Sequence, residues 1–267
     1  MPILAAHSFV NLSVLINSVS AFLSFSLLAS SVYIFNDIID LDDDRRHPQK
    51  KNRPIAGGYL SIDVAVLILI VCFSCSLLLA FNLSYIFLII CICYILLNIL
   101  YSNFIKKIII LDIVLLTTFY MIRLACGFTI NSVEFSIWLT GFFFFLFFSL
   151  GTLKRYIDLI KYDNLKSVRG YYNKDSEILK NLGFSSGLMG TIILILYSLN
   201  EKIETLYNSP NILLLLSLIY IYWIARIWLL ANREIIDSDP VKFALKDKVS
   251  YIVIITALII VFFATYI

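Results

Sequence analysis

Long apolar runs follow one another along nearly the whole of this sequence, and each is long enough to cross a membrane as a helix. Runs of about 17 to 25 residues meet the length that the hydrocarbon core requires, and short polar connections separate them. We expect eight such helices, near residues 14–36, 62–81, 84–101, 108–130, 134–152, 181–199, 211–231 and 249–267. No polar stretch is long enough to fold separately, so the pattern predicts one all-α integral membrane domain over residues 1–267.

Composition and charge placement support this prediction and add a topology. Hydrophobic residues make up 61% of the chain and charged residues only 15%, whereas soluble proteins have about 25% charged residues. Most Lys and Arg residues lie in four loops, near residues 45–53, 106–107, 154–180 and 233–248. The positive-inside rule places these loops in the cytoplasm, so we expect the chemistry on the cytoplasmic face of the membrane. The net charge of +3 is too small to indicate a nucleic-acid partner.

The loop after the first predicted span carries the clearest sign of chemistry. Residues 36–58 read NDIIDLDDDRRHPQKKNRPIAGG. Four polar residues, three of them spaced by four, would share one face of a helix: Asn36, Asp37, Asp40 and Asp44. Asp42 and Asp43 lie off this face, where a solvated charge run explains them equally well.

These carboxylates would repel one another unless a cation neutralised them. Magnesium favours a few carboxylates together with phosphate oxygens, so we predict Asp37, Asp40 and Asp44 as catalytic residues that hold Mg²⁺. Three cations that follow at once would pair with phosphate: Arg45, Lys50 and Arg53. The segment therefore predicts a cradle for a magnesium-bound diphosphate.

Two charges fall within or near the fourth predicted span. Asp112 and Arg123 are about three helical turns apart, so they face the same way, yet the roughly 16 Å between them is too far for a mutual ion pair. Charges in a bilayer usually line a cavity, and we predict Arg123 as a substrate-binding residue. For Arg226, a functional role and simple snorkelling to the membrane surface remain equal alternatives. Asp239, which precedes Pro240, is typical of a helix N-cap.

The first motif, N-D-x-x-D-x-x-x-D, resembles that of the UbiA superfamily of intramembrane prenyltransferases, whose fold is a ring of helices around a central cavity. The continuation is more particular, because Asp44-Arg45, His47-Pro48, Lys50 and Arg53 to Ala56 are similar to the D-R-x-H-P-x-K-x-x-R-P-I-A stretch of the polyprenyl-phosphate phosphoribosyltransferase branch. The resemblance covers nearly the whole chain. It implies Mg²⁺ as cofactor, phosphoribosyl diphosphate as donor and a polyprenyl phosphate as acceptor.

Two further stretches carry the same resemblance. Tyr101 and Lys106 are similar to the Y-S-x-x-L-K of the family, which implies substrate binding. The third cytoplasmic loop has Lys154-Arg155-Tyr156 and then Asp158, similar to K-R-Y-x-E with Asp for Glu. We expect Lys154, Arg155 and Tyr156 to bind substrate.

Lys154 and Arg155 are expected at a water-exposed helix entrance, where cations suit phosphate; a basic helix held to anionic lipid is the alternative. Asp158 is predicted as catalytic, either touching metal or ribose or only orienting Lys154.

The sequence thus predicts transfer of 5-phosphoribose from phosphoribosyl diphosphate to a polyprenyl phosphate. A conventional UbiA prenyltransferase that alkylates an aromatic acceptor is the alternative, although its second D-x-x-x-D motif is missing here. A transporter is the alternative that is not an enzyme, but a transporter does not require acidic and basic residues to gather on one face of the membrane. Residues 2–9 look like the tail of a further span, so we expect eight full helices plus a remnant of a ninth. The oligomeric state cannot be read from the sequence.

Overall fold

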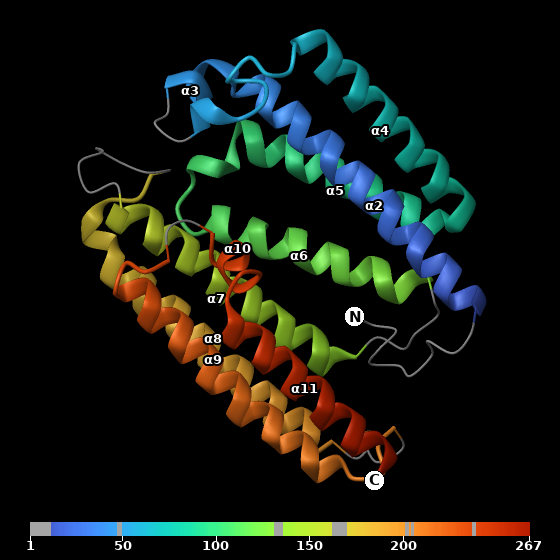
Figure 1. Cartoon of the computed structure of the whole chain (residues 1–267), viewed down its shortest axis with the longest axis vertical. Coiled ribbons are helices and arrows are strands. Elements are labelled where there is room, and N and C mark those ends of the chain that lie inside the picture. The colour runs from blue at the N-terminus through green and yellow to red at the C-terminus, as the bar shows by residue number, and fades with distance from the viewer. Residues whose placement is uncertain are drawn as a thin grey trace. The chain divides into compact units, whose positions relative to one another are not determined.

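The computed structural model describes residues 12–46, 50–130, 136–161, 170–200, 203, 206–236 and 239–267, and the statements below concern these residues. They form helices and no strand, with eight helices long and apolar enough to cross a membrane (Figure 1). These are α2 (Leu12–Ile39), α4 (Ile62–Leu83), α5 (Tyr85–Asn103), α6 (Leu111–Ile130), α7 (Ile137–Lys161), α8 (Ser176–Ser198), α9 (Leu214–Asn232) and α11 (Lys248–Tyr266). The prediction of an all-α membrane protein with eight spans is confirmed.

Short helical pieces connect the spans. Two are α-helical, α3 (Leu41–Arg46) and α10 (Pro240–Ala244), and four are 3₁₀ turns: η1 (Lys50–Asn52), η2 (Ile105–Lys107), η3 (Asn173–Asp175) and η5 (Pro210–Leu213). The remnant helix proposed at residues 2–9 and the pair His47-Pro48 lie outside the described residues.

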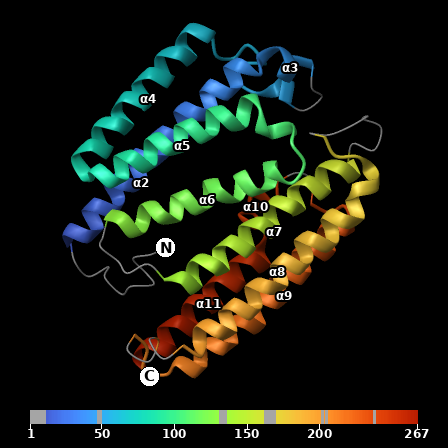
Figure 2. The ribbon, with the colours of Figure 1, turned by 180° about the vertical axis from the view of Figure 1, so that it is seen from behind.

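The chain divides into two compact units, and the first comprises residues 1–104 and 122–134. In it α2, α4 and α5 lie side by side (Figures 1 and 2). Small residues let α2 and α4 approach closely: Ser24 Oγ donates to the carbonyl of Ser76 at 2.9 Å, and both residues are fully buried. The prediction of a single domain over 1–267 is not tested by this division and stays a prediction.

The second unit comprises residues 105–121 and 135–267. Here α8 packs against both α7 and α9, and α9 packs against α11. Gly183, Gly187 and Gly190 of α8 face large side chains of α9. Because glycine has no side chain, α8 and α9 can pack closely along this row. Trp228 fills this contact and donates its indole N–H to Ser149 Oγ on α7 at 3.0 Å.

The close contact at Gly183 predicts a matched pair of outcomes. A Cβ at Gly183 would overlap the ring of Trp228, whereas one at Gly141 on α7 would meet only Ile193 at 3.8 Å. We expect Gly183→Ala to destabilise the protein by about 1–3 kcal/mol. Gly141→Ala should be neutral or slightly stabilising, because alanine favours helix over glycine by about 1 kcal/mol. Thermal unfolding in detergent measures both, and equal midpoints would contradict the packing described.

Most predicted boundaries agree with the structure to within a few residues, but α7 is an exception. It ends at Lys161 and not near residue 152. The helix continues beyond its apolar run because no proline or glycine interrupts Thr152 to Lys161. The segment from Lys154 to Asp158, expected at the start of a loop, therefore belongs to helix α7.

Candidate functional site

The predicted cradle lies in the first unit, where α2 passes into α3. Only Asp40 separates the two helices, and the hydrogen bonds continue through it: the N–H of Asp40 donates to Asn36 O at 2.9 Å, and the N–H of Asp44 donates to Asp40 O at 2.8 Å. This keeps Asn36, Asp40 and Asp44 on one side of the backbone. Asp44 is buried, while Asp42 and Asp43 are exposed, which confirms that the last two lie off the shared face.

Arg53 brings two of the acids together. Its Nη1 donates to Asp37 Oδ1 and to Asp44 Oδ2, each at 2.7 Å, and Lys50 Nζ lies 3.8 Å from Asp44 Oδ1. A turn places Arg53 for this contact, since its N–H donates to Lys50 O at 2.9 Å and its carbonyl accepts from Gly57 at 2.7 Å. Asp37 and Asp44, which precede Arg53 by sixteen and nine positions, thus both bind its guanidinium.

The convergence of Asp37 and Asp44 bears on the predicted metal. Both carboxylates reach a single nitrogen, so they can share one cation, and Mg²⁺ needs only one or two carboxylates when phosphate oxygens complete its shell. The pair fits such an ion. The predicted set of three does not gather: within the described ranges no three His, Cys, Asp or Glu side chains lie close enough to hold a metal. Asp40 lies on the same helix face as Asn36 and Asp44.

Asn36 connects the cradle to an apolar cleft. Its Oδ1 accepts from Ser102 Oγ at the end of α5, at 2.8 Å. Asn36 also lines a cleft of about 240 Å³ between α2, α4 and α5, whose walls are otherwise mostly apolar and include Phe35, Phe73 and Ile95. A charged headgroup at the cradle would therefore have an apolar space beside it.

Four more predicted residues are placed as follows, Lys106 in the second unit and the other three in the first. Arg45 is exposed, and Tyr101 and Lys106 are half-buried, the first on α5 and the second in η2. Arg123, on the part of α6 that belongs to the first unit, has its guanidinium 5.9 Å from the centre of the Phe25 ring. Its hydrogen-bond partners include Tyr94. The roughly 16 Å that separate Asp112 from Arg123 along α6 rule out an ion pair between them, as predicted.

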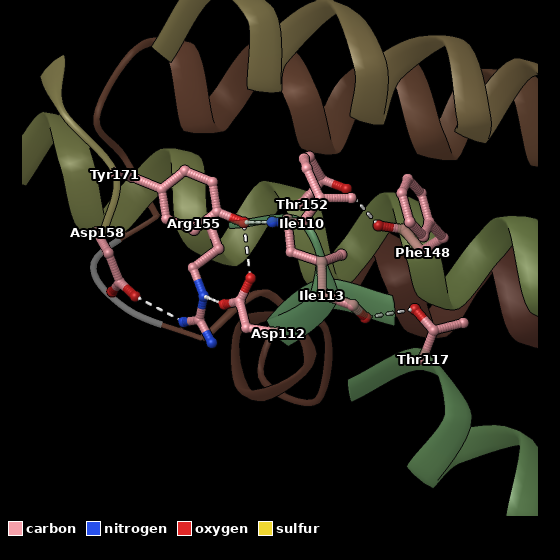
Figure 3. A network of polar contacts seen from close by, with 9 residues as sticks. All are labelled: Ile110, Asp112, Ile113, Thr117, Phe148, Thr152, Arg155, Asp158 and Tyr171. Atoms are coloured by element: carbon pink, nitrogen blue, oxygen red, sulfur yellow. Dashed lines mark hydrogen bonds and ion pairs between the residues drawn. The ribbon is translucent and has the colours of Figure 1, made fainter. Parts of the chain in front are cut away.

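The second cluster lies in the second unit and centres on Arg155 (Figure 3). Its Nε donates to Asp112 Oδ2 at 2.5 Å and its Nη1 to Asp158 Oδ2 at 3.1 Å. Tyr171 Oη donates to Asp112 Oδ1 at 2.6 Å and accepts from the N–H of Ile110 at 2.7 Å. Burial, and next the bond to Asp112, raise the pKa of Tyr171, so it remains a neutral donor.

This arrangement corrects the expected surroundings of Arg155. A water-exposed helix entrance was predicted, but only 2% of the side chain is exposed and it binds two carboxylates. The neighbouring Lys154 does lie near the surface, 39% exposed, and donates to Asp239 Oδ2 at 2.6 Å. Adjacent residues on a helix point about 100° apart. The side chain of Arg155 therefore points into the second unit, and that of Lys154 points toward the surface.

The contacts of Asp158 and Lys154 bear on the two alternatives for Asp158. Asp158 accepts from Arg155, and Lys154 donates to Asp239. The role of Asp158 stays a prediction. Tyr156, predicted to bind substrate, is buried and donates from Oη to Asn232 at 2.9 Å. Asp112 and Asn232 were not predicted as partners, because they come from distant segments. A charge at the start of α6 that must be neutralised was the available signal for Asp112.

Asp239 and Asp247 serve as helix caps in this unit. Asp239 accepts from the N–H groups of Val241 and Lys242 at the start of α10, which confirms the predicted N-cap. Burial acts to raise its pKa, but Lys154 and these N–H groups hold the pKa of Asp239 below its usual range. Asp247 caps α11 and forms a two-pronged ion pair with Arg226, at 2.7 and 3.0 Å. Arg226 therefore has a structural partner.

The Asp247–Arg226 pair predicts a pH dependence. Burial acts to raise the pKa of Asp247, but its bonds to Arg226 and Ser250 outweigh this and lower it. A lowered folded-state pKa stabilises the fold above the unfolded value near 3.9, and the gain is lost as pH falls through the folded value.

We therefore expect Asp247→Asn, which keeps an N-cap, to lower the unfolding temperature at neutral pH. The deficit should shrink as the pH falls below about 5 and should be lost once the pH has passed through the lowered folded-state pKa of Asp247. The exposed Asp63 supplies the control Asp63→Asn, and a pH-independent deficit would contradict the pairing.

Comparison with known proteins agrees with the fold and the motifs. The model of the UbiA prenyltransferase family matches residues 2–174. A protein of Sinorhizobium fredii, y4nM, is 30% identical over 87% of this chain and 46% of its own length. The nodulation protein NoeC of Azorhizobium caulinodans is 26% identical over 88% of this chain and 78% of its own. The decaprenyl-phosphate phosphoribosyltransferase of Mycobacterium tuberculosis is 31% identical over 52% of this chain and 46% of its own. The chain thus spans about half the length of two of these relatives.

Solved structures show the same fold. A UbiA homologue from Archaeoglobus fulgidus bound to DMAPP and Mg²⁺ has a TM-score of 0.67 and 17% identity, covering 91% of this chain and 87% of its own. A structure of digeranylgeranylglyceryl phosphate synthase has a TM-score of 0.64 and 15% identity, covering 97% and 88%. With the family model matching well over half of the chain, and eight membrane-length helices in the described part, this multi-pass membrane protein belongs to the UbiA prenyltransferase family.

Proposed function

We propose that the protein transfers 5-phosphoribose from phosphoribosyl diphosphate to a polyprenyl phosphate, at the cytoplasmic face of a bacterial inner membrane. The observation that carries the proposal is the pair Asp37 and Asp44, which converge on Arg53 with Lys50 beside them. Acids and bases interleaved in this way suit a diphosphate that arrives with a divalent cation. The sequence similarity to decaprenyl-phosphate phosphoribosyltransferases favours phosphoribose over an isoprenyl group on that diphosphate.

The roles follow from this geometry. Asp37 and Asp44 would hold Mg²⁺, which when bound neutralises charge on the leaving diphosphate. Lys50 and Arg53 would bind phosphate oxygens that Mg²⁺ leaves uncovered. The bond between the anomeric carbon and the diphosphate oxygen breaks, and a bond from that carbon to an oxygen of the polyprenyl phosphate forms. The acceptor is already an anion, so positioning replaces a general base.

Each unit, taken by itself, has a feature that suits one part of the acceptor. Lys154 lies near the surface and can exchange Asp239 for a phosphate, whereas Arg155 is committed to Asp112 and Asp158. The cleft beside Asn36 would receive an isoprenoid segment of the lipid. The earlier assignment of Arg123 to substrate binding stays a proposal, supported by the position of this cation within a span.

The test incubates purified protein with Mg²⁺, radiolabelled phosphoribosyl diphosphate and polyprenyl phosphate. Parallel reactions replace these substrates by isoprenyl diphosphates with aromatic acceptors, and a third set contains excess chelator. We expect a labelled lipid in the first reaction, none with chelator and none in the second. Product in the isoprenyl reaction alone would establish the conventional prenyltransferase and overturn the proposal.

Lys154 gives a prediction within this scheme. Lys154→Ala should lower kcat/KM for polyprenyl phosphate by about 10- to 100-fold, because a hydrogen bond to a charged group contributes about 1.5–3 kcal/mol. Its effect on stability should stay within about 1 kcal/mol, as for other partly exposed ion pairs. Lys174→Ala, at an exposed site in η3, is the control. Unchanged kinetics would mean that this end of α7 only contacts lipid.

A further inference from the structure

A chain of polar contacts ends on a partly exposed carboxylate. Tyr171, Asp112 and Arg155 are 1%, 0% and 2% exposed, whereas the side chain of Asp158 is 26% exposed. Hydrogen bonds join the four residues in this order (Figure 3). We propose that Tyr171, Asp112 and Arg155 are positioning residues that hold Asp158 in the orientation in which it contacts the substrate. The inference rests on the proposed function, because it takes Asp158, which the sequence predicts as catalytic, to contact the substrate of that reaction.

The contacts leave Arg155 little freedom. Asp112 uses both of its oxygens, Oδ2 for Arg155 and Oδ1 for Tyr171, so its carboxylate plane is fixed from two directions. Arg155 is anchored through Nε, and its planar guanidinium then directs Nη1 to Asp158 Oδ2. Asp158 follows Arg155 by three positions on the same helix, within reach of such a bond. Of these four residues, only Asp158 is appreciably exposed. It lies at the end of the network, where Arg155 holds its carboxylate.

The backbone beneath this network supports a positioning role. Ile110 has a φ of +66°, a left-handed conformation that is unusual for a β-branched residue. Strained residues of this kind persist where the surroundings fix them, and they gather at functional sites. The Tyr171 hydroxyl provides that fixation, since it accepts from the N–H of Ile110 and donates to Asp112. Gly170 allows the approach, because a Cβ there would lie 2.7 Å from the carbonyl oxygen of Lys107.

A double-mutant cycle separates positioning from simple stability. The variants are Tyr171→Phe, which removes one hydroxyl, Asp158→Asn, and both together, with kcat and KM measured per amount of folded protein. If Tyr171 acts through Asp158, Tyr171→Phe should lower kcat by about 10- to 100-fold, as loss of an orienting hydrogen bond does. It should have no further effect in the Asp158→Asn background. Asp112→Asn, nearly isosteric, should behave alike if Tyr171→Phe folds poorly.

The control is Tyr172→Phe, because Tyr172 is the next residue and is 61% exposed. It should leave kcat and KM unchanged. Losses that are additive in the cycle, or a loss of folded protein without a change in kcat, would overturn the inference and leave a structural role for Tyr171.

A second readout does not need activity. Labelling with a water-soluble carbodiimide and an amine, followed by peptide mass spectrometry, reports how freely the Asp158 carboxylate reacts. Labelling should rise several-fold in Tyr171→Phe and Asp112→Asn but not in Tyr172→Phe. If the wild type transfers neither kind of donor, the proposed function fails while this comparison still tests the positioning. Equal labelling in Tyr171→Phe and the wild type would overturn the inference even in a fully active enzyme.

Discussion

Asp44→Asn should lower turnover by about 10²- to 10³-fold, the usual loss when a group that stabilises transition-state charge is removed. Asp44 is 2% exposed and accepts from Arg53. Asparagine keeps its shape but not its charge, so the site loses one of the two carboxylates that converge on a cation. Arg53 keeps its bond to Asp37, and the protein should remain folded. The measurement is the initial rate of phosphoribosyl transfer at saturating Mg²⁺.

The neighbouring acid provides the control for this change. Asp43 precedes Asp44 directly but is exposed on the other side of α3. Asp43→Asn removes the same charge from the same short helix, so a general effect of net charge would appear in both variants. We expect Asp43→Asn to retain nearly full activity. Equal losses in the two variants would show that the acidic segment acts by its overall charge and that no specific cradle exists.

Local patterns predicted those parts of the molecule that depend on local forces. The eight spans follow from apolar length alone, and the i,i+4 spacing of Asn36, Asp40 and Asp44 predicted which acids share a face. The N-cap at Asp239 follows likewise from one residue and the proline after it. None of these features requires knowledge of which helices become neighbours.

The partners of the charges were not predictable in the same way. Arg155 pairs with Asp112, 43 residues away, and Lys154 pairs with Asp239, 85 residues away. A run of adjacent cations carries no information on which one enters the bundle, because that depends on how α7 is rotated against its neighbours. The sequence pattern therefore predicted a water-exposed environment for both Lys154 and Arg155. In the structure Lys154 is partly exposed and Arg155 is buried.

That contrast leads to a large effect on stability. Arg155→Met should destabilise the protein by about 3–5 kcal/mol, the usual result when one partner of a buried ion pair is removed. The cause is Asp112, which is 0% exposed. Among the side chains that the structure describes, its remaining hydrogen-bond partner would be the Tyr171 hydroxyl. Thermal or denaturant unfolding in detergent measures the change.

Two comparisons make the measurement specific. Lys154→Met removes the adjacent cation, whose pair with Asp239 is partly exposed, and should change stability by no more than about 1 kcal/mol. In the double variant Asp112→Asn/Arg155→Met the buried negative charge is gone as well, so much of the lost stability should return. A deficit in Arg155→Met that the second substitution leaves unchanged would mean that the methylenes of Arg155 stabilise the fold by packing, and that its charge contributes little.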